Sequence, residues 1–324
     1  MLRLRCTTED LLHVSIAEHP APLGELTLAM QMLQRRDPDP AFVPWREQIA
    51  RQLPAEGRRL LQLVSPSGAG PMFLDPPSRT VEEGLDRVLS TPRAEVRAEL
   101  KRVCAIDRPL TSWTKRLAEQ DREAWKMLDQ ALRTGYRSVL AERWHSLRAG
   151  FDAETAWRAK ILARQGISAL FASLRPTLRW NGLTLEADFP RHLDLTLHGH
   201  GLVLRPTLLW SGYPLVAYYA DRPTTLIYPA LTPLPLLAPA RAPDPLCALL
   251  GTTRAGALRS LITGRTTTGL ARELSVSVAA ASLHAKTLRE AGLIVSRREG
   301  KAVCHECTPL GLDLLAAEPP RTGG

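Results

Sequence analysis

The sequence is poor in cysteine: its 324 residues include five, at positions 6, 104, 247, 304 and 307. Their odd number and irregular spacing exclude the paired framework of a small disulfide-rich secreted domain. The N-terminal stretch MLRLRCTTEDLLHVSIAEH also lacks the uninterrupted apolar core of a signal peptide. These two absences predict a cytoplasmic protein in a reducing compartment.

Long apolar runs are missing as well. The longest uncharged stretch, PTTLIYPALTPLPLLAPA at 223–240, contains five prolines. Proline lacks the backbone N–H and interrupts the hydrogen-bond ladder that a membrane-spanning helix requires. The sequence therefore predicts a soluble chain with no membrane partner.

Lysine is scarce, since it accounts for only six of the 42 basic residues. The net charge of +9 and the sequence pI near 9.7 favour anionic partners such as nucleic acid. A composition rich in arginine, alanine and proline is also what a GC-rich genome produces. The charge alone therefore does not establish nucleic-acid binding.

The common catalytic motifs are absent. The chain has no G-x-S-x-G, no H-E-x-x-H, no phosphate-binding glycine loop and no paired C-x-x-C motifs. Trp113, Trp125, Trp144 and Trp157 lie in successive predicted helices, where they suit a core or the lining of an apolar ligand pocket. We predict that the protein is not an enzyme. Two alternatives stay open: an enzyme within residues 1–228, or an interaction adaptor, with the C-terminal region as a targeting or docking module.

The residues that are present indicate an α+β fold. Residues 1–175 show mostly helical periodicity, with a helix expected from Thr7 or Thr8 through TEDLLHVSIA and helix ends expected near Gly135, Gly150 and Gly166.

After Pro176 the pattern changes to alternating apolar and polar residues, and Asn181-Gly182 predicts a hairpin turn. Residues 177–228 are therefore expected to form a small antiparallel sheet of hairpins, with a bend at Gly199 and Gly201. Together, residues 1–228 are predicted to be an effector or dimerisation domain. A proline-rich linker at 229–245 separates it from a C-terminal domain at 246–316 and a tail at 317–324.

The C-terminal domain contains three predicted helices and two strands. Thr266 can cap the second helix, and the third helix is expected from about Val278 to Ala291. The strands LIVSRR and KAVCHEC are joined by Glu299-Gly300, which fits a tight turn. This order is the layout of a winged helix-turn-helix, whose third helix enters the major groove of DNA.

The stretch LSVSVAAASLHAKTLREAGLIVSRREGKAV, followed by TPLG, resembles the DNA-binding domain of ArsR-type transcriptional repressors over roughly residues 245–316. The resemblance implies a repressor that binds double-stranded DNA through the third helix and a basic wing, with Thr266 opening the second helix. The candidate DNA-binding residues are Thr266, Ser277, Val278, Ala279, Ser282, Leu283, Lys286, Arg297, Arg298 and Lys301.

This chain departs from the family at Val278, Ala279 and Leu283, where members commonly have polar residues. Readout is therefore expected to rely more on thymine methyl groups and on DNA shape. The preceding 240 or so residues resemble, more loosely, a poorly characterised domain found before such winged helices in actinomycete regulators, which implies no particular ligand. A homodimer is expected because one recognition helix has limited specificity, and a small-molecule effector or a partner could bias the spacing of the two copies.

Two groups of residues have side chains that bind metals elsewhere. Cys304, His305 and Cys307 fall on a predicted strand, where Cys304 and Cys307 point to opposite faces and do not converge. The resemblance points the same way, because metal-sensing relatives place their ligands on the second helix or on a terminal helix. Cys304 is expected to pack as a small apolar group, with His305 or Cys307 partly exposed. The second group, His192, His198 and His200, brackets a glycine-rich bend and is interpreted as a polar turn. We predict no metal site and no cofactor.

Overall fold

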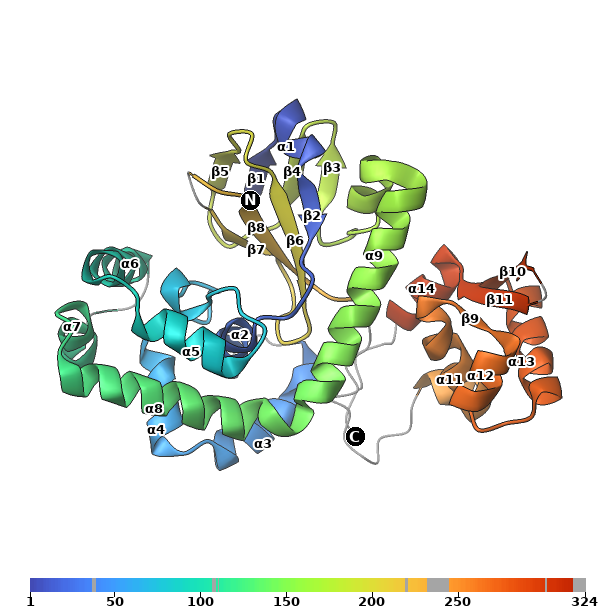
Figure 1. Ribbon diagram of the computed structural model, residues 1–324, viewed down its shortest axis with the longest axis horizontal. Coiled ribbons are helices and arrows are strands. Elements are labelled where there is room, and N and C mark those ends of the chain that lie inside the picture. Colours follow the sequence, from blue (N-terminus) through green and yellow to red (C-terminus); the bar gives the residue numbers. More distant parts are fainter. Residues whose placement is uncertain are drawn as a thin grey trace. The chain divides into compact units, whose positions relative to one another are not determined.

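A computed structural model describes residues 1–36, 39–106, 109, 111–218, 221–231, 245–300 and 302–316. The chain forms two compact units, Met1–Ala230 and Leu231–Gly324 (Figure 1). Both units combine helices with small sheets, in agreement with the predicted α+β class. Most of the predicted linker (232–244), Lys301 and the tail at 317–324 lie outside the described residues.

Helices occupy most of the first unit before residue 173. They are α1 (Thr8–Leu12), α2 (Pro22–Gln34), α3 (Val43–Gln52), α4 (Ala55–Arg58), α5 (Val81–Leu89), α6 (Arg93–Ile106), α7 (Ser112–Ala118), α8 (Arg122–Val139) and α9 (Trp144–Ala172), with the 3-10 turns η1 (Pro40–Phe42), η2 (Arg59–Gln62), η3 (Met72–Leu74) and η4 (Ala141–Arg143). Several begin at a side chain that accepts a backbone hydrogen bond: Thr80 caps α5, Thr111 caps α7 and Asp121 caps α8.

The predicted helix ends near Gly135 and Gly150 are wrong, because both glycines lie inside helices. A Cβ atom at Gly135 would lie 3.0 Å from Leu60, and one at Gly150 would lie 2.5 Å from Leu208. These positions need a residue without a side chain for close packing, not for a turn. Gly166 alone interrupts its helix, with a φ of 81° that kinks α9.

A buried ion pair braces this kink. Arg158 lies before it and is fully buried, and its Nε donates to Glu154 Oε1 at 2.8 Å. Its Nη1 donates to the carbonyl oxygen of Ser173, which follows the last turn of α9, at 2.5 Å. The Arg158 guanidinium thus joins the two halves of the helix.

Two four-stranded sheets complete the first unit. Their strands are β1 (Leu2–Arg5), β2 (Val14–Ile16), β3 (Arg179–Asn181), β4 (Thr184–Ala187), β5 (Leu193–Thr196), β6 (Leu202–Thr207), β7 (Leu215–Ala217) and β8 (Thr224–Pro229). One sheet has the order β3-β4-β1-β5 and the other β2-β6-β8-β7.

The predicted set of antiparallel hairpins after a mostly helical segment differs from the structure in two respects. Strands β1 and β2 come from the first sixteen residues, where helix α1 ends at Leu12. In addition, β1 is parallel to β5, β2 is parallel to β6, and β6 is parallel to β8. The hairpin at Asn181-Gly182 is present between β3 and β4, in agreement with the prediction.

The bend at Gly199 and Gly201 therefore leads from one sheet into the other and does not close a hairpin. The fully buried Asp10 explains this connection, because its Oδ1 accepts a hydrogen bond from the Gly201 N–H at 3.0 Å. Asp10 lies in α1, which connects β1 of one sheet to β2 of the other, and Gly201 lies in the connection from β5 to β6. This hydrogen bond therefore joins the two connections that pass between the sheets.

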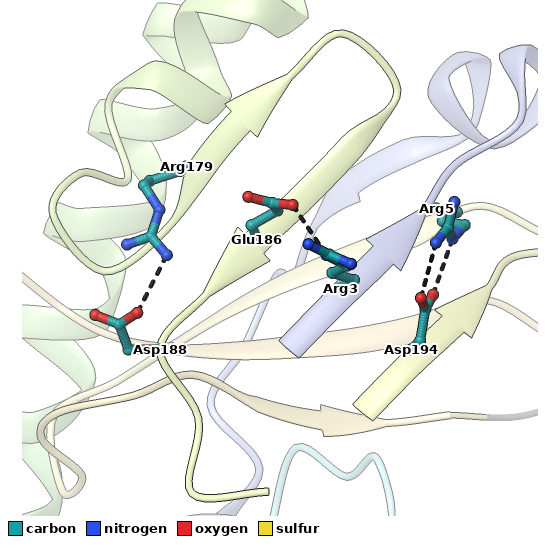
Figure 2. A network of polar contacts seen from close by, with 6 residues as sticks. All are labelled: Arg3, Arg5, Arg179, Glu186, Asp188 and Asp194. Carbon is teal, nitrogen blue, oxygen red and sulfur yellow. Dashed lines mark hydrogen bonds and ion pairs between the residues drawn. The ribbon is translucent and has the colours of Figure 1, made fainter. Parts of the chain in front are cut away.

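The sheet β3-β4-β1-β5 has one apolar face and one charged face. Leu2, Leu4 and Leu185 are fully buried on the first. The other face carries three ion pairs: Arg3–Glu186 at 3.1 Å, Arg5–Asp194 at 2.8 Å and Arg179–Asp188 at 3.1 Å (Figure 2). Each arginine is matched by a carboxylate, so this face offers no net charge to an anionic partner.

The second unit is a small helical domain with one sheet. Its elements are α10 (Pro245–Leu250), α11 (Thr252–Ser260), η5 (Leu261–Thr263), β9 (Arg265–Thr266), α12 (Thr267–Glu273), α13 (Val278–Glu290), β10 (Ile294–Glu299), β11 (Ala302–Cys307) and α14 (Pro309–Ala316). The strand order is β10-β11-β9. Its core consists of small and aliphatic side chains, among them Leu258, Ala281 and Leu288.

Candidate nucleic-acid interface

Helix α13 has one buried face and one exposed face. The Ser277 side chain caps it by accepting a hydrogen bond from the Ala280 N–H at 3.1 Å. Ala281, Ala285 and Leu288 recur at helical spacing and are at most 1% exposed. Because these three side chains fix the rotation of the helix, the positions between them face outward.

The exposed face contains the predicted contact residues of this helix. Val278 is 51% exposed and Leu283 is 62% exposed, which is unusual for large aliphatic side chains. Ala279, Ser282 and Lys286 are exposed beside them. Lys286 lies 3.8 Å from Glu290 on the next turn, a weak surface ion pair that leaves its ammonium group accessible. The face therefore offers methyl groups, a hydroxyl and one cation.

Thr266 caps α12, as predicted, and also belongs to a strand that was not predicted. Its hydroxyl caps α12 by accepting a hydrogen bond from the Gly269 N–H at 3.1 Å. It is also the second residue of the short strand β9, where it pairs with Cys304 of β11. Thr266 thus fixes the start of α12 to the sheet, and its side chain is only partly exposed.

Strands β10 and β11 form an antiparallel hairpin that carries exposed cations. Arg297 pairs with Cys304 and Arg298 pairs with Val303, so the two arginines project on opposite faces of the ribbon. Both are exposed, and neither makes an ion pair with any residue that the structure describes. Gly300 has a φ of 62°, which suits the turn. Lys301 of the predicted wing lies outside the described residues.

The expectation that His305 or Cys307 would be partly exposed is met by Cys307, which has intermediate exposure, whereas His305 is only 4% exposed. Its Nε2 lies 2.9 Å from the Thr267 hydroxyl and its Nδ1 lies 2.8 Å from the Ser296 hydroxyl. Two hydroxyls therefore satisfy both ring nitrogens, which allows the imidazole to be buried. The sequence carries no signal for this bridge, because its three residues come from α12, β10 and β11.

The two cysteines beside His305 on β11, Cys304 and Cys307, also have surroundings that suit packing. Cys307 is partly buried and its thiol donates to the Leu258 carbonyl oxygen at 3.2 Å. Burial, together with the negative charge of Glu306, raises the pKa of the Cys307 thiol to about 12. A metal requires the thiolate, so this environment opposes metal binding at Cys307. Cys304 is partly buried on the strand between its neighbours.

The three histidines at the glycine-rich bend, His192, His198 and His200, are all exposed. Within the described ranges, no group of three or more His, Cys, Asp or Glu residues is arranged to hold a metal ion. The helices in these ranges are also too short or too polar to cross a membrane.

No family model, curated protein or solved structure matches this chain. Its function is therefore inferred from its own sequence and geometry.

Proposed function

We propose that the second unit is a winged helix-turn-helix of ArsR type that binds double-stranded DNA, and that the chain is a transcriptional regulator. In this proposal α12 and α13 form the helix-turn-helix, and the β10–β11 hairpin is the wing. The order of helices and strands from α11 to β11 supports it. So does the composition of residues 246–316, which contain nine Lys or Arg against five Asp or Glu.

One observation carries the proposal: the second unit has both a solvent-exposed face on α13 and exposed arginines on the β10–β11 hairpin. The major groove of B-DNA is wide enough for a helix, and its thymine methyl groups accept aliphatic contacts. Val278 and Leu283 offer such contacts, since both are more than half exposed. Arg297 and Arg298 can reach phosphates on either side of the hairpin, which adds affinity without sequence preference.

A homodimeric repressor is the form of regulator that we propose. One helix of thirteen residues reads only a few base pairs, so a unique site in a genome requires a second copy on an adjacent half-site. The first unit is then the part that sets the spacing of the two DNA-binding units. A protein that occupies a site in this way blocks transcription without further machinery.

The test is genomic DNA-affinity selection with the full chain and the variant Arg297→Ala/Arg298→Ala. We expect the wild type to enrich a small set of inverted repeats, and the variant to bind them roughly tenfold or more weakly. The slope of log affinity against log salt should also decrease by about two, one for each lost phosphate contact. Leu283→Ser should instead change the preferred bases and leave this slope unchanged.

The matched control is Arg93→Ala/Arg97→Ala, which removes two exposed arginines from α6 of the first unit. It should bind the selected sites like the wild type. Equal loss in both variants would mean that only the net charge matters, and uniform recovery of all sequences would refute sequence-specific binding.

A further inference from the structure

The first unit contains a pocket of about 370 Å³ that the proposed DNA contact does not use. Its walls come from the helices α2 and α6, from residues 67–72 and 189–192, and from strands β5, β7 and β8. The volume lies within the range of roughly 300–1,000 Å³ that is common for small-molecule sites. All of these elements belong to one compact unit.

Most of the pocket wall is apolar. The side chains that form it include Leu28, Met72, Leu195, Leu215 and Ile227. An aliphatic or aromatic group would be stabilised here by burial of its apolar surface away from water. The wall therefore favours a ligand with an apolar body.

Gln31 places an unsatisfied amide in this apolar wall. Its side chain lines the pocket and is 1% exposed, and its Oε1 has no hydrogen-bond partner among the described residues. Leaving such a group unpaired is unfavourable, because folding has removed its hydrogen bonds to water. Because rotation of the amide exchanges its oxygen and nitrogen, Gln31 can offer a ligand either an acceptor or a donor. A polar group of a bound molecule would remove this cost.

The glycines of the loop at 67–72 do not form a phosphate cradle. A Cβ atom at Gly68 would lie 2.3 Å from Leu215, and one at Gly70 would lie 3.3 Å from Gln31 Nε2. Gly68 also has a φ of 79°, which favours glycine, and both residues lie where the loop packs closely against neighbouring side chains. The site is therefore unlike the backbone nests that bind nucleotides.

The charges on the wall favour an anionic group. Asp75 is held by Arg205, with Arg205 Nη1 donating to Asp75 Oδ1 at 3.2 Å, and Arg102 is paired with Glu99. Arg191 also lines the pocket and is exposed, and it makes no ion pair within the described part of the chain. The uncompensated charge at the pocket is therefore positive.

We propose that this pocket binds a small amphipathic carboxylic acid. The apolar body lies among the aliphatic side chains, the Gln31 amide hydrogen-bonds its polar end, and Arg191 attracts the carboxylate. Its regulatory meaning rests on the proposed function: such an acid is then the effector that changes DNA affinity. The binding site itself stands without that function.

The test measures binding of octanoate to the full chain by titration calorimetry, with octan-1-ol and inorganic phosphate as probes of the separate parts. We expect octanoate to bind, and octan-1-ol and phosphate each to bind at least about tenfold more weakly, a difference of ~1.4 kcal/mol. Gln31→Leu and Arg191→Gln should each weaken octanoate binding by about tenfold. The controls Gln130→Leu and Arg97→Gln make the same changes at exposed helix positions and should bind octanoate like the wild type.

Arg191 is exposed, so Arg191→Gln tests the site even if Gln31→Leu destabilises the fold. No octanoate binding at millimolar concentration would refute the site. Equal binding of octan-1-ol, or octanoate binding unaffected by Arg191→Gln, would refute the anionic class. Tighter binding of phosphate would refute the amphipathic class.

The effector role is tested separately by titrating a selected operator with and without octanoate. A change in DNA affinity of at least about fivefold, absent in Arg191→Gln, is the expected coupling. If no operator exists, the proposed function fails while the calorimetric result still decides the site. Octanoate binding without any change in DNA affinity would overturn the effector role alone.

Discussion

At the scale of single residues, the buried side chain of His305 links separate elements of the second unit. It joins Thr267 at the start of α12 to Ser296 on β10, across a separation of 38 residues on one side and nine on the other. Burial lowers its pKa, and the positive charge of Arg289 acts in the same direction. At a pH between the lowered pKa of the folded unit and the ordinary value of about 6.5, the His305 imidazole is therefore neutral in the folded unit and protonated in the unfolded chain.

This environment predicts a loss of stability in acid. In the unfolded chain the His305 pKa is about 6.5, and in the folded chain it is lower. Lowering the pH from 7 to 5 should therefore reduce the free energy of unfolding of the second unit, because the unfolded state binds the proton more readily. The hydrogen-exchange protection factors of peptides from residues 264–275 and 293–307, which correct for the slower intrinsic exchange at low pH, should decrease over this range.

His305→Gln removes the titrating group and should make the protection factors of these peptides much less dependent on pH. His284→Gln, on α13, makes the same change at a half-buried position without this bridge and should retain the wild-type response. An identical response of His305→Gln and the wild type would contradict the role of His305.

At the scale of structural elements, α13 shows which part of the site can be predicted from a sequence. Helix α13 (Val278–Glu290) matches the expected range of about Val278 to Ala291. The features that fix it in the structure, which are the cap at Ser277, the buried stripe and the positive φ of Gly292, are all local. The bridging role of His305 could not be predicted, since it depends on two hydroxyls from other elements. For the same reason Gln31, one polar residue in a helix of mostly apolar ones, gives no indication of the pocket that it lines.

Two glycines at strand connections give a second prediction at this scale. Gly201 and Gly182 have positive φ angles of 92° and 67°. A Cβ atom at Gly201 would lie 2.4 Å from the carbonyl oxygen of His13, whereas nothing lies within 4 Å of one at Gly182. Gly182→Ala should thus cost only the backbone strain, about 1 kcal/mol. Gly201→Ala should cost more than about 3 kcal/mol, because the crossing between the two sheets must shift.

Urea unfolding followed by tryptophan fluorescence measures this difference. All seven tryptophans precede residue 231, so their signal reports the first unit within the full chain. Equal losses of stability for the two variants would show that the contact with His13 does not constrain the fold.

At the scale of the whole molecule, the proposed dimer predicts that a DNA site must contain two half-sites. Two copies of α13 would read half-sites whose centres lie about 34 Å apart, or a multiple of that distance. Anisotropy titrations should therefore show that scrambling one half of a selected inverted repeat weakens binding by about 100-fold or more. DNA with both halves scrambled supplies the nonspecific baseline. Equal affinity for intact and half-scrambled sites would mean that a single copy binds.

The division of the chain into helical and β-rich segments was predictable, whereas the arrangement of the strands was not. Periodicity reports the local environment of each residue, but β1 and β5 pair across about 190 residues with no turn between them to fix their direction. The N-terminal strands therefore appeared as parts of a helical region. The wrong expectation at Gly135 and Gly150 has a related cause, because close packing against distant side chains leaves no local pattern.

The pairing of β1 and β2 with strands after residue 183 has a consequence for synthesis of the chain. A ribosome releases residues 2–16 long before their partners at 184–207, so these first strands stay unpaired while the helices between them emerge. Among the described residues of the second unit, by contrast, paired strands lie at most about 40 residues apart in the sequence. Short separations favour rapid folding. We therefore expect the second unit to fold quickly once it has been made, whereas the first unit cannot complete its two sheets until residues 184–207 have been made.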